Sequence, residues 1–455
     1  MSTSVYTLLI VESPVMARII QNLSPRSVYV VATEGFCWRP KYNAAAHQLK
    51  AIADPDKVDI RKEIKEQAAW ANSVIIATDS DPSGDFIAWS VSRFLKSNGV
   101  KRGYIQNLSK NGIHSMLSEV QQLDEPRLET RLKNRFLIND LWQKNRHLPD
   151  MQLAGLTAIF GANNSYNHFL NDGAELFISS EPISCSPGEL FTVVPQQKEQ
   201  HYAIHKPLST YDVVASVKEL GIAKTYQDAQ LLLQQLFQTS LHSSGESLIS
   251  YPRTDANALY SETWESMRRQ YMKLGSVNQL KPRFLQEIAG DETPHESICP
   301  LNLSVKPKDA AGELSSGLGS LYRFIYNHTL RSITMPAVLE HSFVNELNPG
   351  IYFYPAQSQS VAEKSISVNP CVTVSDLGMK LNRMGVVKPS AFGKALDAWA
   401  AKGWIQISNN VAIPGKPVLQ RAGYAAALRE KLLSLNRMAE NNTLSGETVQ
   451  TLLTS

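Results

Sequence analysis

Apolar runs and helical patterns alternate over the N-terminal quarter of the chain. Tyr6 to Val11 and Ser73 to Ala77 are continuous apolar runs typical of strands buried on both faces, and Val28 to Ala32 is a further strand candidate. Helices are predicted after the first strand, over Glu63 to Trp70 and through Ile87 to Leu95. Repetition of strand, polar loop and helix predicts an open α/β sheet. Such sheets bind ligands at the carboxyl ends of their strands.

The clearest helical pattern covers Thr210 to Phe237. Gly221 interrupts the pattern, so we expect one helix before this glycine and a second from Tyr226 onward. A third helix is predicted over Ser261 to Leu274, with its serine as N-cap, and a fourth over Leu321 to Ile333. The middle of the chain is therefore predicted to be helical.

Strand patterns return towards the C-terminus. Glu340 to Phe353 and Ile366 to Val374 alternate between apolar and polar positions, which predicts strands. Val387 to Ile407 has the pattern of a helix, a turn and a strand. Signals are weaker over Leu148 to Gln200, where we expect loops and short strands. The sequence shows no internal repeat.

Length and composition indicate a multidomain globular protein. The 455 residues suffice for roughly two to four domains. An apolar content of 43% with 19% charged residues provides ample core and excludes a disordered chain. The formal net charge is only +3, so any surface that binds nucleic acid must be local.

Two segments carry a local excess of positive charge. Pro126 to Arg146 has six Lys or Arg against two acids on a helical pattern, which suits phosphate contacts but equally a solvated helix face. Asp376 to Ser455 has ten Lys or Arg against five acids, an excess of five. We regard the second segment as another candidate basic patch.

The cysteines and the chain's apolar runs exclude several other classes. Four cysteines lie far apart without a Cys-x-x-Cys pair, which argues against zinc ribbons and provides no disulfide framework. No apolar run reaches the roughly 18 residues of a membrane span. The N-terminus lacks the basic segment of a signal peptide. We therefore expect a cytoplasmic protein without a membrane partner.

An acidic loop follows the apolar strand that ends near Ala77. Asp79, Asp81 and Asp85 fall within seven residues, and like charges this close are unfavourable unless a cation or solvent separates them. Hard oxygen ligands at a strand end suit Mg²⁺. An exposed turn in which Asp79 or Asp81 caps the next helix explains the pattern equally well.

A second candidate site lies at Ser250 to Asp255. If the stretch is extended, Tyr251 and Arg253 point to the same side, and Pro252 restricts the backbone between them. A phenol with a guanidinium beside it suits covalent attack on a phosphodiester, since the guanidinium also holds a phosphate oxygen. Taken alone, the stretch matches a surface turn better, because short motifs often match by chance. His295 belongs to a His-Glu pair. It is either a surface residue or a hydrogen-bond donor to a phosphate.

The order of these signals resembles the type IA DNA topoisomerases. Short matches occur in the family's order along nearly the whole chain. They are Val11-Glu12-Ser13-Pro14, Ala77-Thr78-Asp79-Ser80-Asp81, Leu248 to Asp255, His295-Glu296 with Ile298 and Pro300, Leu321-Tyr322 to Leu330 with Pro336-Ala337, and Lys388-Pro389-Ser390 to Gly403-Trp404-Ile405. The first two matches resemble a Toprim domain, and the third resembles the segment that bears the attacking tyrosine.

The resemblance implies a multidomain fold with α/β and α+β parts, in which a Toprim domain joins a toroidal core with a β-rich arch. The implied domains are a Toprim domain at 1–125, a basic DNA-binding core domain at 126–165 and 376–455, a shortened arch at 166–205 and 335–375, and a helical domain at 206–334. The implied partner is DNA, preferentially single-stranded or negatively supercoiled. We expect a monomer associated with a bacterial nucleoid or plasmid, and leave its protein partners open.

The resemblance also implies roles for individual residues. Tyr251 would attack a phosphodiester and form a 5′-phosphotyrosine bond, while Arg253 stabilises charge on the transition state and His295 hydrogen-bonds the same phosphate. Glu12 would assist proton transfer at the leaving 3′-oxygen or hold a metal. Mg²⁺ would be bound by Asp79, Asp81, Glu12 and Asp85 and would position the broken end for religation without ATP. The implied DNA contacts are Arg18, Arg135, Lys388 and Ser390.

The chain departs from the family pattern around the metal loop. The family sequence Asp-Arg-Glu-Gly-Glu is replaced by Asp81-Pro82-Ser83-Gly84-Asp85, so one carboxylate becomes Ser83. A basic residue expected soon after Glu12 is absent, and a Gly-Arg-Val-Gln motif and zinc ribbons are not found. The alternative is therefore a degenerate paralogue that binds DNA with weak or no strand passage. A Toprim nuclease or primase fits less well, because neither needs the tyrosine, arginine and histidine together.

Overall fold

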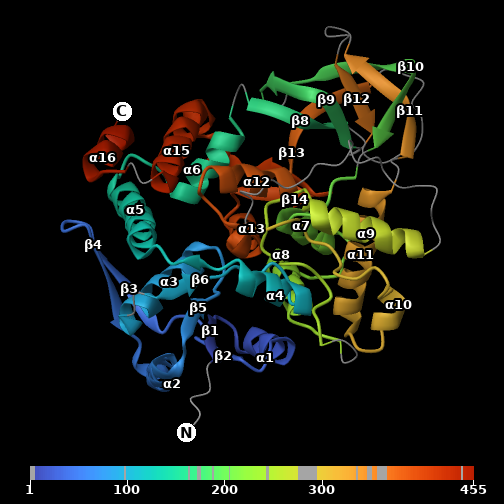
Figure 1. The fold of residues 1–455 in the computed structure, drawn as a ribbon. Helices are drawn as coiled ribbons and strands as arrows, with labels where there is room; N and C mark the ends of the chain where they lie inside the picture. Colours follow the sequence, from blue (N-terminus) through green and yellow to red (C-terminus); the bar gives the residue numbers. More distant parts are fainter. Residues whose placement is uncertain are drawn as a thin grey trace.

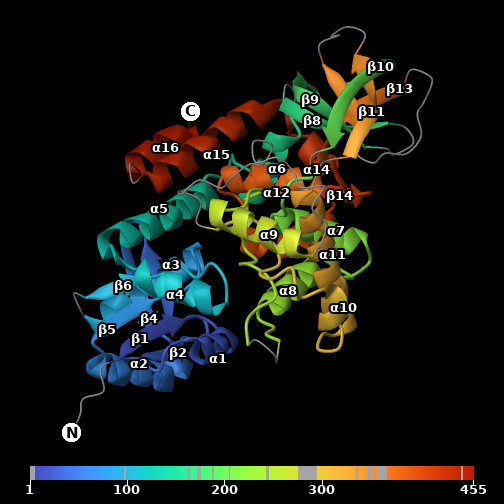
Figure 2. The same cartoon turned by 45° about the vertical axis from the view of Figure 1, so that its right-hand side comes forward.

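The computed structural model describes residues 6–96, 99–161, 164–171, 176–186, 189–203, 205–241, 245–274, 295–334, 337–345, 351–355, 366–441 and 444–454. A parallel sheet and a body of strands lie at opposite ends of the molecule, with helices between them (Figures 1 and 2). No helix within the described ranges is long and apolar enough to cross a membrane.

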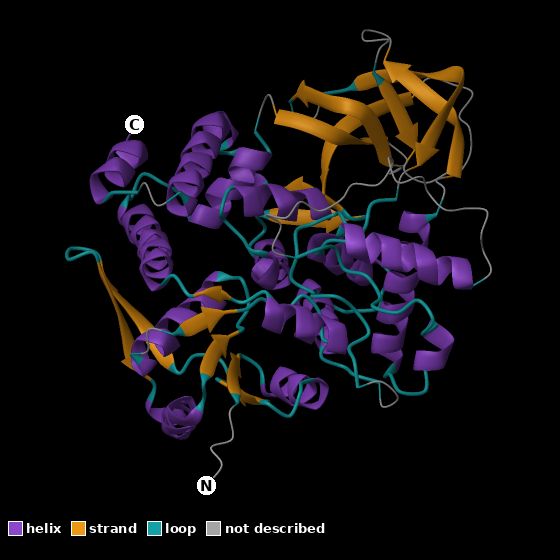
Figure 3. Cartoon of the chain, viewed as in Figure 1, coloured by secondary structure: helices purple, strands orange, loops and turns teal. Residues whose placement is uncertain are grey.

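A five-stranded sheet organises the N-terminal domain (Figure 3). Its order is β2, β1, β5, β6, β7; the first four strands are parallel, and β7 pairs antiparallel with β6. Leu9 and Val11 pack in one core with residues of α1 and α4, whereas Leu8 and Ile10 pack in another with α2 and α3. This two-sided burial explains the continuous apolar run. The elements are β1 (Thr7–Val11), α1 (Pro14–Leu23), β2 (Val28–Ala32), β3 (Trp38–Asn43), β4 (Gln48–Ala53), α2 (Val58–Trp70), β5 (Ser73–Ile76), α3 (Pro82–Leu95), β6 (Val100–Arg102), α4 (Lys110–Ser118) and β7 (Gln121–Gln122).

Six antiparallel strands close on themselves at the far end of the molecule. The order is β10, β11, β12, β9, β8, β13, and β13 pairs back to β10. Phe169, Phe177 and Phe353 fill the interior and are almost fully buried. The strands are β8 (Asn164–Asn171), β9 (Leu176–Cys185), β10 (Phe191–Ala203), β11 (Ala337–Asn345), β12 (Tyr352–Pro355) and β13 (Ile366–Thr373).

Helices fill the space between the two ends. One group comes from the middle of the chain: α7 (Thr210–Glu219), α8 (Tyr226–Phe237), α9 (Ser261–Lys273), α10 (Pro307–Ala310) and α11 (Ser316–Ile333). The other elements are α5 (Glu125–Lys144), α6 (Met151–Ile159), α12 (Val374–Arg383), α13 (Phe392–Ala401), β14 (Ile405–Ser408), β15 (Val411–Pro414), α14 (Lys416–Leu419), α15 (Ala425–Glu440) and α16 (Gly446–Thr454).

Most predicted elements are confirmed, and the errors concentrate where the periodic signal is weak. The prediction of loops and short strands over 148–200 was wrong in part, since this range holds α6 and strands of 8, 10 and 13 residues. α12 was not predicted at all. Tyr260, not Ser261, occupies the N-cap position of α9, and no side chain caps that end.

Packing between α7 and α12 depends on a glycine. Gly378 of α12 lies against the ring of Tyr211 on α7, and a Cβ atom at this position would overlap that ring. Tyr211 is fully buried, and its ring also meets Phe392 edge-on at 4.8 Å. Because the ring is held from two sides, it has no free space into which to move.

We predict that Gly378→Ala lowers the thermal unfolding midpoint, because overpacking a buried contact costs about 1–3 kcal/mol. Gly319→Ala in α11 is the control, since the atom nearest to its new Cβ would be Leu314 Cβ at 4.0 Å. The control should be neutral or stabilising, as alanine favours a helix over glycine by about 1 kcal/mol. Equal midpoints for the two variants would contradict the packing described here.

Candidate active site

The segment carrying Tyr251 joins the N-terminal domain to the helical domain. The Tyr251 amide donates to the Gln106 carbonyl at 3.1 Å, and the Ser247 amide donates to the Leu108 carbonyl at 2.9 Å. The segment 105–108 follows β6, so it lies beyond the carboxyl edge of the parallel sheet. Strand pairing across the domain boundary therefore places the tyrosine beside the acidic loop.

The Tyr251 side chain is enclosed by aromatic rings. Its ring stacks on His295 at 4.0 Å and meets Phe237 edge-on at 5.6 Å. Only 5% of the residue is exposed. Burial raises the pKa of the Tyr251 hydroxyl well above its usual value; the Asp79 carboxylate adds to the rise, and Arg253 opposes it. The phenol is therefore neutral and shielded in the DNA-free protein.

His295 is held in the neutral form. Burial lowers the pKa of its imidazole to about 3. One ring nitrogen, Nε2, lies 2.8 Å from Ser80 Oγ, and the other, Nδ1, lies 2.9 Å from Gln106 Oε1. Both contacts come from the N-terminal domain, so the histidine is fixed against Tyr251 from that side.

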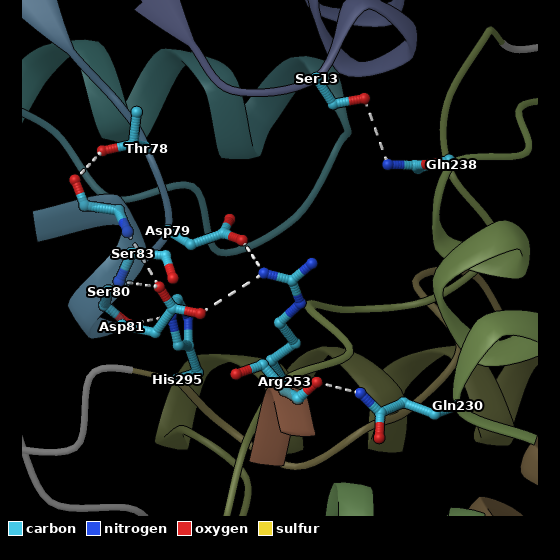
Figure 4. Close-up of polar contacts among 12 residues, drawn as sticks. Ser13, Thr78, Asp79, Ser80, Asp81, Ser83, Gln230, Gln238, Arg253 and His295 are labelled. Atoms are coloured by element: carbon cyan, nitrogen blue, oxygen red, sulfur yellow. Dashed lines mark hydrogen bonds and ion pairs between the residues drawn. The ribbon is translucent and has the colours of Figure 1, made fainter. Parts of the chain in front are cut away.

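Arg253 reaches across the domain boundary to the acidic loop (Figure 4). Its Nη1 pairs with Asp79 Oδ2 and lies 3.6 Å from Asp81 Oδ2. The carboxylates are 10% and 18% exposed, whereas the guanidinium is 29% exposed. Their negative charges raise the pKa of Arg253, so the guanidinium stays charged. Two poorly hydrated carboxylates repel each other, and a cation that pairs with both of them offsets this repulsion.

The acidic loop turns directly into α3. Asp81 is the N-cap and accepts from the Ser83 and Gly84 amides, both at 2.9 Å. Gly84 lies so close to the Asp79 carbonyl that a Cβ atom would overlap it. The metal-ligand and helix-cap interpretations of the sequence are therefore compatible, because Asp81 Oδ1 caps the helix while Oδ2 faces Arg253.

Glu12 and Asp85 differ in their surroundings. Burial raises the pKa of Glu12 to about 7, with Asp79 and Asp81 adding to the rise and Arg253 opposing it. Glu12 Oε2 is buried without a hydrogen-bond partner among the described residues. Asp85 instead pairs with Arg131 of α5 at 3.5 Å. The structure thus brings Glu12 to the acidic pair but directs Asp85 to another helix.

The predicted metal ligands form a partial set. Among the described residues, no group of three His, Cys, Asp or Glu side chains is arranged to hold a metal ion. Asp79, Asp81 and Glu12 nevertheless act on one another's charge, and Glu12 presents an unsatisfied buried oxygen. Mg²⁺ in proteins commonly takes one or two carboxylates and keeps several waters or substrate phosphates. This donor set fits such an ion, without Asp85.

The predicted DNA contacts lie in different places. Arg18 is exposed on α1. Arg135 of α5 pairs with Glu440 at 2.8 Å, and the charge of Arg135 acts on Lys388. The Ser390 carbonyl accepts from the Gln230 side chain of α8. The charges of Arg135 and Lys388 therefore act on each other, and Ser390 lies in the short turn that begins after Lys388, whereas Arg18 is on α1 of the N-terminal domain.

Two residues of the site were missed from the sequence. Arg102 of β6 is buried and donates to the carbonyls of Ile76 at 3.1 Å and Asp79 at 2.9 Å, which fixes the end of β5. Gln106 orients both His295 and the Tyr251 backbone. Their position at the end of a strand was a usable signal, since strand ends collect at one edge of such a sheet.

The chain is similar to several known proteins. A family model described as the Toprim domain matches residues 7–111. DNA topoisomerase 1 of Campylobacter jejuni is 21% identical over 495 aligned residues, covering 90% of this chain and 70% of the relative. DNA topoisomerase 1 of Helicobacter pylori is 22% identical, covering 74% and 53%. Topoisomerase I from Thermotoga maritima shares the fold, with a TM-score of 0.66 and 17% identity over 98% of this chain and 89% of that one.

The predicted resemblance to the type IA DNA topoisomerases is confirmed. The predicted fold class, a Toprim α/β domain on a type IA core with a β-rich arch, is confirmed. Two positions that differ from the family pattern have clear structural surroundings. Met16, where a basic residue was expected, is buried in the core, and Ser83 lies in the first turn of α3. The curated relatives are longer, since the chain spans 53–70% of their lengths.

Glu12 should make stability depend on pH. Its folded pKa of about 7 exceeds the unfolded value of 4.5, so the stability it contributes is present below pH 4.5 and is lost as pH rises through 7. Glu12→Gln removes this titration. We predict similar unfolding midpoints for wild type and variant at pH 4, but a more stable variant at pH 8, by up to about 2 kcal/mol. A constant difference across this range would contradict the burial of Glu12.

Proposed function

We propose that this chain is an ATP-independent DNA topoisomerase that cuts one DNA strand through a 5′-phosphotyrosine intermediate, passes a strand and religates the break. The observation that carries the proposal is the convergence of Tyr251, Arg253 and His295 with Glu12 and the acidic pair at one domain boundary. A nucleophile, a phosphate-binding cation and a carboxylate are the groups that transesterification of a phosphodiester requires. The DNA topoisomerase 1 relatives support the same conclusion.

The chemistry assigned to the residues follows from their contacts. The Tyr251 oxygen forms the new bond to phosphorus and gives its proton to the Asp79 carboxylate, with which it is hydrogen-bonded. The bond from phosphorus to the 3′-oxygen breaks. Arg253 stabilises the charge that develops on the phosphate, and His295 donates a hydrogen bond to it in the tautomer that carries the proton on Nε2. Glu12, whose pKa is raised to about 7, is protonated often enough near neutrality to give its proton to the leaving 3′-oxygen.

Substrate entry requires the boundary to open. Tyr251 is 5% exposed, and Arg253 is paired with the acidic loop, so neither is available to DNA in the DNA-free arrangement. Contacts such as the one from Gln238 Nε2 to Ser13 Oγ at 3.3 Å (Figure 4) cross the same boundary. A single strand is the natural substrate, because its phosphates reach a narrow site that a duplex does not enter. Negatively supercoiled DNA supplies such strands.

Asp79 and Asp81 would hold Mg²⁺, with Glu12 nearby. The ion supplies positive charge that positions phosphate oxygens of the broken strand. Arg253 occupies the space between these carboxylates in the DNA-free protein, so a phosphate that attracts Arg253 leaves them free for the metal. The altered loop, with Ser83 in place of a carboxylate, is the observation that favours the alternative of a paralogue with weak strand passage.

Tyr251→Phe should abolish both the covalent DNA adduct and relaxation of negatively supercoiled DNA. The substitution removes the attacking oxygen and keeps the ring that stacks on His295. The measurement is denaturing electrophoresis of a 5′-labelled and a 3′-labelled single-stranded oligonucleotide after incubation with Mg²⁺. Tyr226→Phe is the control, because Tyr226 lies at the start of α8 outside the site.

Two outcomes decide between the proposals. Wild-type protein that forms neither adduct nor relaxed DNA with Mg²⁺ would rule out the topoisomerase. Wild-type protein that forms the adduct but does not relax DNA would support the paralogue with impaired strand passage.

Asp81→Asn should separate cleavage from religation. Asparagine caps a helix as well as aspartate does, so α3 keeps its N-cap while the metal site loses a charge. We expect the adduct to form but to need about tenfold more Mg²⁺ for reversal, since even changes outside the ligand set weaken metal sites by that much. The readout is adduct reversal after adding salt, over a series of Mg²⁺ concentrations. Reversal that is equally fast in EDTA would remove the metal from the mechanism.

A further inference from the structure

A cluster of cations lies on α5 away from Tyr251. Arg131 and Arg135 are one helical turn apart and project towards the C-terminal end of α15, which lies along α5 (Figure 2). The charges of both arginines also act on Lys388, which is partly buried. Two guanidiniums therefore face one place, within reach of the charge of Lys388.

The carboxylate of Glu440 occupies that place. Its Oε1 lies 2.8 Å from Arg135 Nη2, and its Oε2 lies 3.6 Å from Arg131 Nη2. One anion with two oxygens thus bridges two guanidiniums, which is how a phosphate of a nucleic acid is held.

The location of Glu440 in its helix is unfavourable by itself. It is the last residue of α15, where the partial negative charge of the helix end disfavours an acid. The side chain is 39% exposed, and the arginines are 29% and 24% exposed. These partly exposed pairs are screened by solvent and salt, so a polyanion is able to displace the carboxylate.

We propose that Glu440 occupies the position of a DNA phosphate between Arg131 and Arg135, as an internal competitor, until the single strand arrives. This inference rests on the proposed function. An internal competitor weakens the binding of isolated phosphates. It therefore favours a strand that also binds at Tyr251. Arg131 contacts Asp85 of α3 as well, so a phosphate here lies next to the Toprim domain.

Glu440→Gln tests the proposal by the affinity for a fluorescein-labelled single-stranded oligonucleotide of mixed sequence, measured by fluorescence anisotropy over a series of salt concentrations. Removing the competitor should tighten binding about two- to fivefold at low salt, the upper part of the range for a solvent-screened ion pair. The slope of log K against log salt should also become steeper by about 0.7. Each phosphate contact releases counterions from the strand, and the variant makes one more such contact.

Glu430→Gln is the matched control. Glu430 is an exposed acid on the same helix, so this variant makes the same change of net charge away from the cluster. At 0.15 M salt it should bind less than about twofold more tightly than wild type, because Glu430 is roughly 15 Å along the helix from Glu440 and the screening length is about 8 Å. In an Arg131→Gln and Arg135→Gln background, the gain from Glu440→Gln should disappear. Thermal unfolding of each variant verifies its fold.

Glu440→Gln that binds as wild type or as Glu430→Gln does, or a gain that persists without the arginines, would overturn the inference. The covalent adduct is measured on the same samples. If wild type forms the adduct while Glu440→Gln changes nothing, only the phosphate site is wrong. If wild type neither binds the oligonucleotide nor forms the adduct, the proposed function fails and the inference fails with it.

Discussion

The ion pair between Arg253 and the acidic loop is the interaction on which the active site depends. Asp79 and Asp81 are poorly exposed carboxylates two residues apart, and such charges need a cation. Arg253 provides it from another domain, next to the residue that carries the nucleophile. The same guanidinium therefore neutralises the loop, closes the domain boundary and keeps Tyr251 shielded. Any ligand that draws Arg253 away must supply charge of its own, which DNA and a divalent cation do together.

The replacements in the metal loop follow the same logic. Asp81 and Gly84 keep the local geometry, because one caps α3 and the other fits against the Asp79 carbonyl. Asp85 turns to Arg131 and so becomes part of a contact between the Toprim domain and α5. Asp85 thus provides a structural link to α5, while the two aspartates that face Arg253 remain.

Much of the fold was predictable from the sequence because it depends on local signals. Continuous apolar runs gave β1 and β5, and a helix interruption at Gly221 separated α7 from α8. The closed body of strands was harder, because β8 to β10 pair with β11 to β13 from a distant part of the chain, and their burial is decided by that pairing. α6 was missed for a different reason: its nine residues are apolar on nearly every side and show no helical period.

The candidate site residues that belong to short recognisable motifs could be found from the sequence. Tyr251, Arg253, His295, Glu12, Asp79 and Asp81 are brought together as the family resemblance implied. Arg102 and Gln106 were not found, because an arginine or glutamine has no distinctive pattern until its partners are known. Asp85 likewise meets Arg131 of α5, and Arg135 meets Glu440 of α15. Only the tertiary structure shows these pairs.

The measurement that tests the central claim most directly is the location of the covalent bond. Wild-type protein would be trapped on a labelled oligonucleotide, digested with protease and analysed by mass spectrometry for the peptide that carries the nucleotide. The account predicts a 5′-phosphate linked to the Tyr251 oxygen. A nucleotide on any other residue, or a linkage to the 3′ end, would contradict it.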